Sequence, residues 1–310
     1  MIVRSDIPKL LLAGMRTEFM QAFTTAEKMY PILTTEISSV KDQETYPWLG
    51  AVPKMREWTD ERVPKGLREH NFTVPNRDWE ASIAVDRNAI DDEQYGQISI
   101  RVKELTVEAA RFFDELIFTL LPEGINTSGS AGSLYENKAV SCYDGKAYFA
   151  TNHSEGNSGT QSNRGSTSLA APALQAAITA MRKFKDDEGK PSHVKPNILV
   201  TSPDLEWSAL EILNSATFAS TTAATSAINT LKGRLQLVTN DYLTDTNNWY
   251  LFDTTRPVKP ILLQMRKTPV FSDLTSNTES AFMRKKMYFG VDWRGAAAFG
   301  DWRTGYVSVV

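Results

Sequence analysis

The sequence has few of the residues that build metal centres or covalent crosslinks. Its 310 residues include one cysteine, Cys142, and three histidines, His70, His153 and His193. A lone cysteine forms neither an intrachain disulfide nor a multi-thiolate zinc site. A three-histidine metal site would need all three histidines, which come from distant segments. We therefore expect no metal and no cofactor, in a chain that fits a reducing compartment.

Long apolar runs and an excess of basic residues are also missing. No stretch approaches the roughly 18 residues of a membrane span, and the first residues have no signal-peptide pattern. We expect a soluble chain made in the cytoplasm, with no membrane partner. With 34 basic and 37 acidic residues the formal net charge is -3. That sign disfavours a dedicated, sequence-specific nucleic-acid binder.

Charge is unevenly distributed along the chain. Residues 41–123 contain 11 basic and 17 acidic side chains, whereas residues 256–310 contain 9 basic and 4 acidic ones. One interpretation is that both regions are ordinary solvated surfaces. The other is that they meet between copies of the subunit, where complementary charge guides the register of association.

Residues 7–30 predict a helix near the start of the chain. Apolar residues recur at spacings of three and four through residues 7–30, including Phe19 and Phe23, and Tyr30-Pro31 ends the pattern. A short terminal helix needs a second surface to cover its apolar side chains. That surface belongs either to the core of the same chain or to a neighbouring subunit.

Residues 45–85 alternate turn-forming residues with isolated aromatics. Proline fixes the backbone and removes a hydrogen-bond donor, so we expect extended arms with bends, and the alternation in residues 79–85 predicts a strand. Three tryptophans, Trp48, Trp58 and Trp79, lie in this stretch with few aliphatic neighbours. We expect them to pack against something other than a local core.

A long helix is predicted between the acidic residues 91–93, which favour a helix N-terminus, and Pro122, which ends the run. Apolar side chains recur within it at spacings of four and three from Ile98 to Leu116. Such a helix of about 27 residues is about 40 Å long. Residues 124–168 follow with loop composition rich in glycine and serine, and they contain a predicted hairpin at residues 141–149.

The second half predicts an α/β unit. Pro172 begins a helix, residues 197–201 form a buried strand, and residues 203–213 form a short helix. Further strands are predicted at residues 235–239, 249–252 and 260–264. From residue 282 onward, β-forming residues punctuated by glycines predict strands that pair with earlier parts of the chain.

The catalytic patterns that we tested fail. A P-loop and a nucleophile elbow are absent from the sequence, and residues 91–93 (DDE) are explained by helix capping. His153-Ser154-Glu155 matches half of a zinc-deaminase signature without its cysteine half. A hydrolase that uses Asp144, His153 and a loop serine is retained as a rival hypothesis. We therefore expect that this chain is not an enzyme.

The order of elements and several motifs resemble the major head subunit of Mu-like tailed phages and prophages. The motifs are residues 46–50 (YPWLG), 56–58 (REW), 61–62 (ER), 76–80 (NRDWE), 90–92 (IDD) and 142–145 (CYDG), with Phe149 and His153. The resemblance is strong over residues 15–160. Beyond residue 160 it rests mainly on element order, together with residues 196–203 (PNILVTSP).

The resemblance implies an α+β fold of the Hong Kong 97 type. It assigns an N-terminal arm to residues 1–40, an extended loop to 45–88, a peripheral domain with the spine helix and the Gly/Ser-rich loop to 90–194, an axial domain to 195–262, and returning peripheral strands to 263–310. The implied function is a major capsid protein that self-assembles into the icosahedral head shell and encloses packaged double-stranded DNA.

The implied partners are further copies in pentamers and hexamers, a separate scaffolding protein and a portal, with assembly in the bacterial host cytoplasm and a final place in the virion. A related alternative is an encapsulin-like bacterial nanocompartment shell. The residues we expect at subunit interfaces are Phe19 and Phe23 in the arm and Trp48, Trp58, Trp79, Glu57, Asp60, Glu61 and Arg62 in the extended loop.

Overall fold

The computed structural model describes residues 7–46, 72–86, 95–219, 226–274, 283 and 285–310. Its helices are α1 (Ile7–Thr25), α3 (Tyr95–Phe118), α4 (Leu120–Glu123), α5 (Ala171–Arg182) and α6 (Glu206–Asn214), with 3-10 turns at Tyr30–Ile32, Pro203–Leu205 and Trp302–Thr304. Its strands are β1 (Thr34–Ser38), β2 (Gln43–Thr45), β3 (Thr73–Pro75), β4 (Arg77–Asp86), β5 (Arg164–Gly165), β6 (Ile198–Thr201), β7 (Thr217–Ala219), β8 (Ser226–Ile228), β9 (Gln236–Thr239), β10 (Trp249–Phe252), β11 (Ile261–Leu274), β12 (Lys286–Phe299) and β13 (Gly305–Ser308). The fold is therefore α+β.

A long four-stranded sheet forms one half of the molecule, with strand order β1-β11-β12-β4. β11 and β12 are antiparallel strands of 14 residues each, and β4 pairs antiparallel with β12. Because side chains alternate between the two faces of a strand, Met287, Phe289, Val291 and Trp293 of β12 share one face, and all four are buried.

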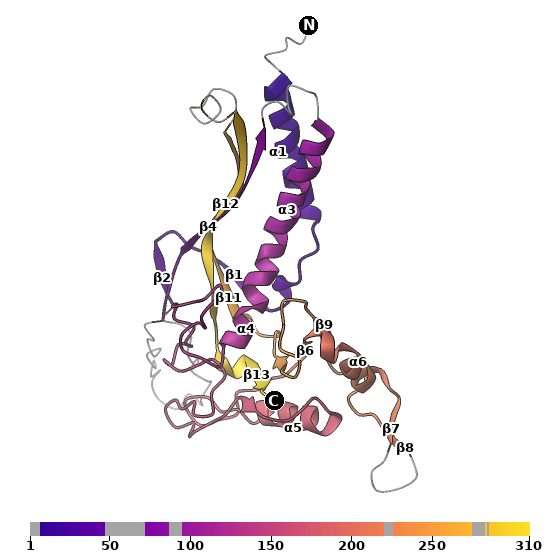
Figure 1. The fold of residues 1–310 in the computed structure, drawn as a ribbon. Helices are drawn as coiled ribbons and strands as arrows, with labels where there is room; N and C mark the ends of the chain where they lie inside the picture. Colours follow the sequence, from indigo (N-terminus) through magenta and orange to yellow (C-terminus); the bar gives the residue numbers. More distant parts are fainter. Residues whose placement is uncertain (1–6, 47–71, 87–94, 220–225, 275–282, 284) are drawn as a thin grey trace, which may run out of the picture.

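Helices α1 and α3 lie side by side over that buried face (Figure 1). The apolar stripe of α3 meets the sheet through Ile98, Val102 and Leu105, which pack in one cluster with Phe289 and Val291. The end of the arm is fixed to α3, because the carboxylate of Asp114 accepts hydrogen bonds from backbone amides of the arm, including that of Tyr30 at 2.6 Å.

A smaller five-stranded sheet, in the order β5-β13-β10-β6-β9, forms the other half. The middle strands β6 and β10 are buried at every position, as their continuous apolar sequences predicted. Helix α5 packs on β13 and helix α6 packs on the edge strand β9.

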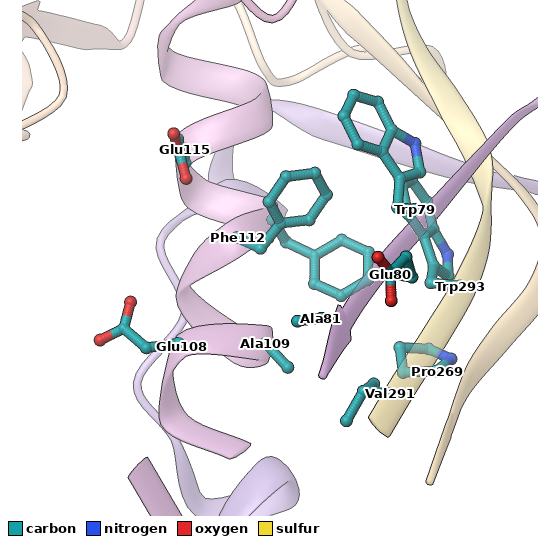
Figure 2. A pocket seen from close by; sticks show the side chains of 11 residues that line it. Trp79, Glu80, Ala81, Glu108, Ala109, Phe112, Glu115, Pro269, Val291 and Trp293 are labelled. Carbon is teal, nitrogen blue, oxygen red and sulfur yellow. The ribbon is translucent and has the colours of Figure 1, made fainter. Parts of the chain in front are cut away.

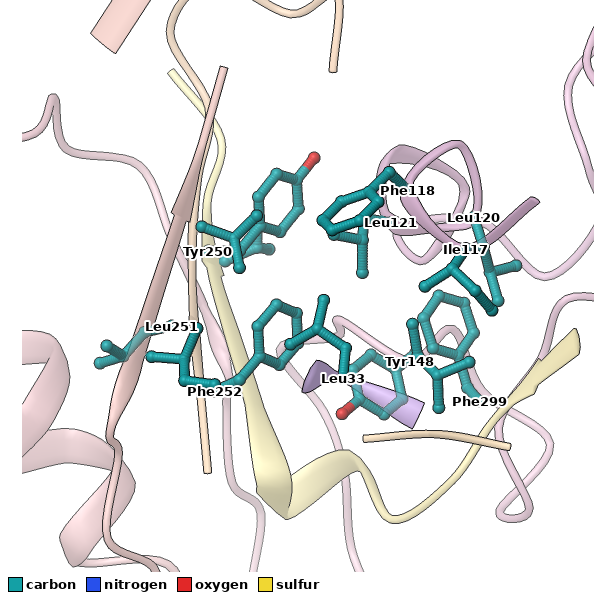
Figure 3. Close-up of a cluster of buried hydrophobic side chains, with 14 of the residues drawn as sticks. Leu33, Ile117, Phe118, Leu120, Leu121, Tyr148, Tyr250, Leu251, Phe252 and Phe299 are labelled. Atoms are coloured by element: carbon teal, nitrogen blue, oxygen red, sulfur yellow. The ribbon is translucent and has the colours of Figure 1, made fainter. Parts of the chain in front are cut away.

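The two halves share one hydrophobic core. Figure 3 shows side chains from the end of α3 (Ile117, Phe118) and from α4 (Leu121) facing side chains from β10 (Tyr250, Phe252) and the end of β12 (Phe299). All six have at most 2% of their surface exposed. The α/β half is therefore joined to the helix-and-sheet half by continuous packing.

Gln264 of β11 joins both ends of the extended segment to the long sheet. This side chain is 1% exposed. Its amide oxygen accepts a hydrogen bond from the Tyr46 hydroxyl at 2.6 Å, and its amide nitrogen donates to the Asn76 side chain at 2.7 Å. Residues 46 and 76 are thereby held close together, although thirty positions separate them in the sequence.

Two expectations need correction. Residues 141–149 form a turn, closed by a hydrogen bond from the Gly145 amide to the Cys142 carbonyl (3.0 Å); none of these residues, all described, belongs to a strand. In addition, β13 pairs with β10 and β5, so the last part of the expected returning segment 263–310 joins the α/β sheet. Alternation identified a strand there but not its partner.

Candidate functional site

An aromatic cluster forms where β4 and β12 pass beneath α3. Trp79 of β4 lies directly opposite Trp293 of β12 in the antiparallel register. Their rings stack with centroids 6.2 Å apart, and Phe112 of α3 packs on Trp79 at 4.9 Å. Phe113 meets Trp293 edge to face at 5.0 Å. The cluster thus connects the long helix to two strands of the sheet.

A groove of about 220 Å³ opens beside this cluster, between α3 and strand β4. We call it the α3–β4 groove; its apolar lining includes Trp79, Ala81, Ala109, Phe112, Val291 and Trp293. Figure 2 shows the two tryptophan rings and the phenyl rings side by side, with carboxylates from the helix and from the strand around them. An apolar floor with polar groups at its edge is typical of a binding surface.

Three carboxylates surround the groove: Glu80 of β4, and Glu108 and Glu115 of α3. Glu108 pairs with Arg111 at 3.3 Å, but both side chains are well exposed, so this ion pair is weak. Burial and the nearby Glu108 carboxylate raise the pKa of Glu115 above its ordinary value. The rim is therefore acidic, and a cation placed there would be stabilised.

A cation from the same strand packs on the Trp79 ring outside the groove. The Arg77 guanidinium carbon lies 4.1 Å from the centre of the Trp79 ring, a cation–π geometry. Burial lowers the pKa of Arg77. This contact lies outside the α3–β4 groove, which Arg77 does not line.

The structure corrects the interpretation that the arm and loop aromatics lack a core within their own chain. Phe19 is 1% exposed and packs on Phe271 of β11 with ring centroids 5.3 Å apart. Phe23 is half-buried beneath Lys28 and against Phe113. Trp79 packs on Trp293 and Phe112 of its own chain and also lines the α3–β4 groove. The remaining expected interface residues, Trp48, Glu57, Trp58, Asp60, Glu61 and Arg62, lie outside the described residues.

The rival hydrolase hypothesis predicted that Asp144 and His153 would meet, and they do. The His153 Nδ1 and Asp144 Oδ2 atoms are 2.7 Å apart. However, His153 is fully buried and stacked on Trp302, and its Nε2 is 3.2 Å from the Tyr148 carbonyl oxygen. Both ring nitrogens are occupied, and neither contacts a serine hydroxyl. The Asp144–His153 pair therefore stabilises the Gly/Ser-rich loop and is not arranged to activate a serine nucleophile.

Acid should weaken the contribution of the Asp144 carboxylate to the folding stability of the chain. Burial alone would raise the pKa of Asp144, but the hydrogen bond and charge of His153 and the Lys146 amide outweigh it, so the pKa lies below its ordinary value. A depressed folded-state pKa gives stability that is present above about pH 4 and is lost as the pH falls through the folded value.

We therefore expect Asp144→Asn to lower the free energy of unfolding by about 1 kcal/mol at pH 6, because the bond to His153 becomes neutral. The difference from the unmodified chain should shrink below about pH 4. Urea unfolding at pH 6, 4.5 and 3 measures it, and a difference that grows with acid would contradict the assignment.

A buried ionic network lies next to this pair. Arg303 is 2% exposed and donates through all three guanidinium nitrogens: to Glu155, to the Tyr143 hydroxyl at 2.7 Å and to the Lys185 carbonyl at 3.0 Å. It also pairs with Asp301 at 3.1 Å. The network ties the Gly/Ser-rich loop to the C-terminal segment.

Comparison with known proteins identifies the family. The sequence profile of the family described as Mu-like prophage major head subunit gpT matches residues 9–172, 163–243 and 244–309. Together these matches span almost the whole chain. The chain belongs to this family.

Individual relatives agree with the family match. The chain is 25% identical over 302 residues to the Mu-like prophage FluMu major head subunit of Haemophilus influenzae, covering 97% of this chain and 72% of that protein. It is 24% identical to the major capsid protein of Escherichia phage Mu, covering 98% and 73%. A chain of the procapsid of bacteriophage JBD30 superposes with a TM-score of 0.59 at 25% identity, over 100% of this chain and 76% of that one.

The family establishes the function in outline. The chain is a major capsid protein of a tailed phage, with the Hong Kong 97-type fold, and the nanocompartment alternative is not favoured. The family is structural rather than enzymatic. Among the described residues, no helix is long and apolar enough to span a membrane, and no cluster of three or more acidic, histidine or cysteine side chains is arranged to hold a metal.

The partners of Trp79 were not predicted from the sequence. Trp293 and Phe112 were visible as members of apolar patterns, but only the strand register places Trp293 opposite Trp79. The alternation of apolar residues through 287–293 was the available signal for Trp293. The acidic rim could not be predicted, because Glu80 and the two helical glutamates come from different elements.

Proposed function

We propose that this major capsid protein assembles as pentamers and hexamers into an icosahedral shell around double-stranded DNA, with a separate scaffolding protein and a portal, in the host cytoplasm. The observation that carries the proposal is the family match over nearly the whole chain. One protein occupying many similar positions needs large surfaces that copies of itself can cover.

Exposed apolar side chains support assembly through both halves of the chain. Trp207 on α6 is 77% exposed and Ile228 on β8 is 82% exposed, and Met20 on α1 is 58% exposed. Large aromatics contribute strongly when a partner covers them. We assign α6 and the β7–β8 hairpin to the axial part of the subunit, with α1, α3 and the long sheet as the peripheral part.

The α3–β4 groove is our candidate for the best-defined contact surface. It combines the aromatic floor described above with an acidic rim, on the side of α3 next to strand β4. A charge of -3 on the whole chain fits a shell that encloses DNA without binding it tightly, because strong DNA binding requires many basic contacts.

Electron microscopy tests the proposal directly. We expect negatively stained preparations of the protein, expressed alone or with the scaffolding protein of its own phage or prophage, to contain closed shells or rings of five and six subunits. Sedimentation velocity gives the accompanying mass distribution. A protein that stays monomeric at high concentration, both with and without the scaffold, would refute the proposed assembly.

A further inference from the structure

The α3–β4 groove has the chemistry of a receptor for a cationic side chain. Its floor is aromatic, and its rim carries three carboxylates, which attract ammonium and guanidinium groups. Among the described residues, Glu115 has no ion-pair partner, and the only cation paired with a rim carboxylate is the well-exposed Arg111. The raised pKa of Glu115 is a further sign that the negative charge here is incompletely compensated.

The beginning of β12 has complementary properties. Lys285 and Lys286 are exposed there, and within the described residues neither forms an ion pair. Met283, just before them, is 72% exposed. Lys285 has a left-handed backbone conformation (φ 51°). This basic end of β12 therefore offers two cations and one flexible apolar side chain.

The basic end of β12 cannot reach the groove of its own chain. Lys286 is five residues along a continuous strand from Val291, a β12 residue that lines the groove. At about 3.3 Å per residue this separation is about 17 Å, longer than a lysine side chain. The strand is fixed by β11 on one side and by β4 on the other. A contact between the two features must therefore join different molecules.

We infer that the α3–β4 groove binds the basic end of β12 from a second copy of this chain. A lysine ammonium of that copy lies among Glu80, Glu108 and Glu115, and its Met283 covers part of the aromatic floor. This contact deepens the proposed function and rests on it, since it names one joint of the shell.

The contact is heterologous, because the groove and the basic end of β12 are different surfaces of the same molecule. Heterologous contacts build rings and closed shells rather than isolated dimers. Complementary charge at such a joint steers association and fixes register. It also makes the joint sensitive to salt, because the Debye length falls from about 10 Å at 0.1 M to about 3 Å at 1 M ionic strength and attraction between exposed charges weakens accordingly.

Charge reversal tests the contact. The acidic surface is reversed by Glu108→Lys with Glu115→Lys, and the basic surface by Lys285→Glu with Lys286→Glu. We expect each double variant to lower the yield of shells at least tenfold. The quadruple variant should recover most of the yield, because opposite charges face each other again. The matched control, Lys183→Glu with Lys232→Glu, alters two exposed lysines elsewhere and should assemble normally.

The results of the charge-reversal experiment separate an error in the inferred contact from an error in the proposed function. If both reversed variants fold, as judged by circular dichroism, and assemble like the unmodified chain, the inference is wrong. It is equally wrong if the quadruple variant is no better than either double variant. Failure of the unmodified chain to form any shell would instead count against the proposed function.

A crosslinking experiment tests the contact without requiring complete shells. One chain carries Ala81→Cys in the groove, and a second chain of different length, lengthened by a tag, carries Met283→Cys. After mixing and mild oxidation we expect a mixed disulfide dimer of intermediate size; the natural Cys142 is buried and should not react. Mixtures that give only same-chain dimers or monomers would overturn the inference.

Discussion

Replacement of Arg303 by methionine should lower the free energy of unfolding of the subunit by about 3–5 kcal/mol, because it leaves a buried acidic group without its partner. The side chains of Arg303 and Glu155 are only 3% and 5% exposed. Burial alone would lower the pKa of Arg303, but Asp301, Tyr143 and Glu155 outweigh it and raise the pKa. The guanidinium is therefore charged in the fold, and urea unfolding of the unassembled subunit measures the loss.

Two further variants separate burial from charge in this experiment. Arg111→Met removes an ion pair between side chains that are 60% and 66% exposed, and it should cost less than about 1 kcal/mol. Arg303→Met combined with Glu155→Met removes both buried charges and should recover a substantial part of the loss. A double variant less stable than Arg303→Met alone would contradict the explanation.

Trp293→Ala should have an effect of similar size, about 3–5 kcal/mol, for a different reason. Trp293 is 4% exposed and contacts Trp79, Phe112 and Phe113. Removing an indole from a packed core loses its burial and leaves a cavity between α3 and the sheet. Chemical denaturation of the unassembled subunit provides the measurement.

Trp207→Ala is the matched control, because it removes the same side chain from a position that is 77% exposed. Its effect on the unfolding free energy of the subunit should stay within about 0.5 kcal/mol. The proposed function predicts that this variant nevertheless assembles poorly. A large loss of subunit stability in Trp207→Ala would show that the helix depends on this indole within its own chain.

These variants separate two roles of aromatic residues in a shell protein. Trp293 and Phe19 stabilise the subunit itself, so their replacement affects folding before assembly. Trp207 and the exposed rim of the α3–β4 groove are accessible, so their replacement affects contacts between subunits. Measurements on the unassembled subunit and on shells should therefore respond differently to the two groups.

The sequence predicted most helices and strands because apolar spacing reports which side of an element is buried. Spacings of three and four identified α3, and the continuous apolar run at residues 197–201 identified β6. The family resemblance was also present in the sequence, since the motifs around Trp79 and Gly145 depend only on residue order, and the family match confirmed it.

The sequence could not decide which surfaces cover the apolar residues. Phe19 was expected at a subunit interface, but α1 lies on the long sheet of its own chain, where Phe271 covers that ring. The spacing of apolar residues shows that one face of a helix must be buried, but it does not identify the distant strand that packs on that face. That choice depends on strand register and on packing between segments more than 200 residues apart.

What the sequence by itself determined is the local structure and the family, because both are written in short-range patterns of residues. Only the tertiary structure decided where the α3–β4 groove lies, since its walls come from α3, β4 and β12 and its rim from α3 and β4. It also decided that Asp144 and His153 form a buried support instead of a catalytic pair. The physical reason is that burial and hydrogen-bond partners are properties of neighbours in space, which chain order does not specify.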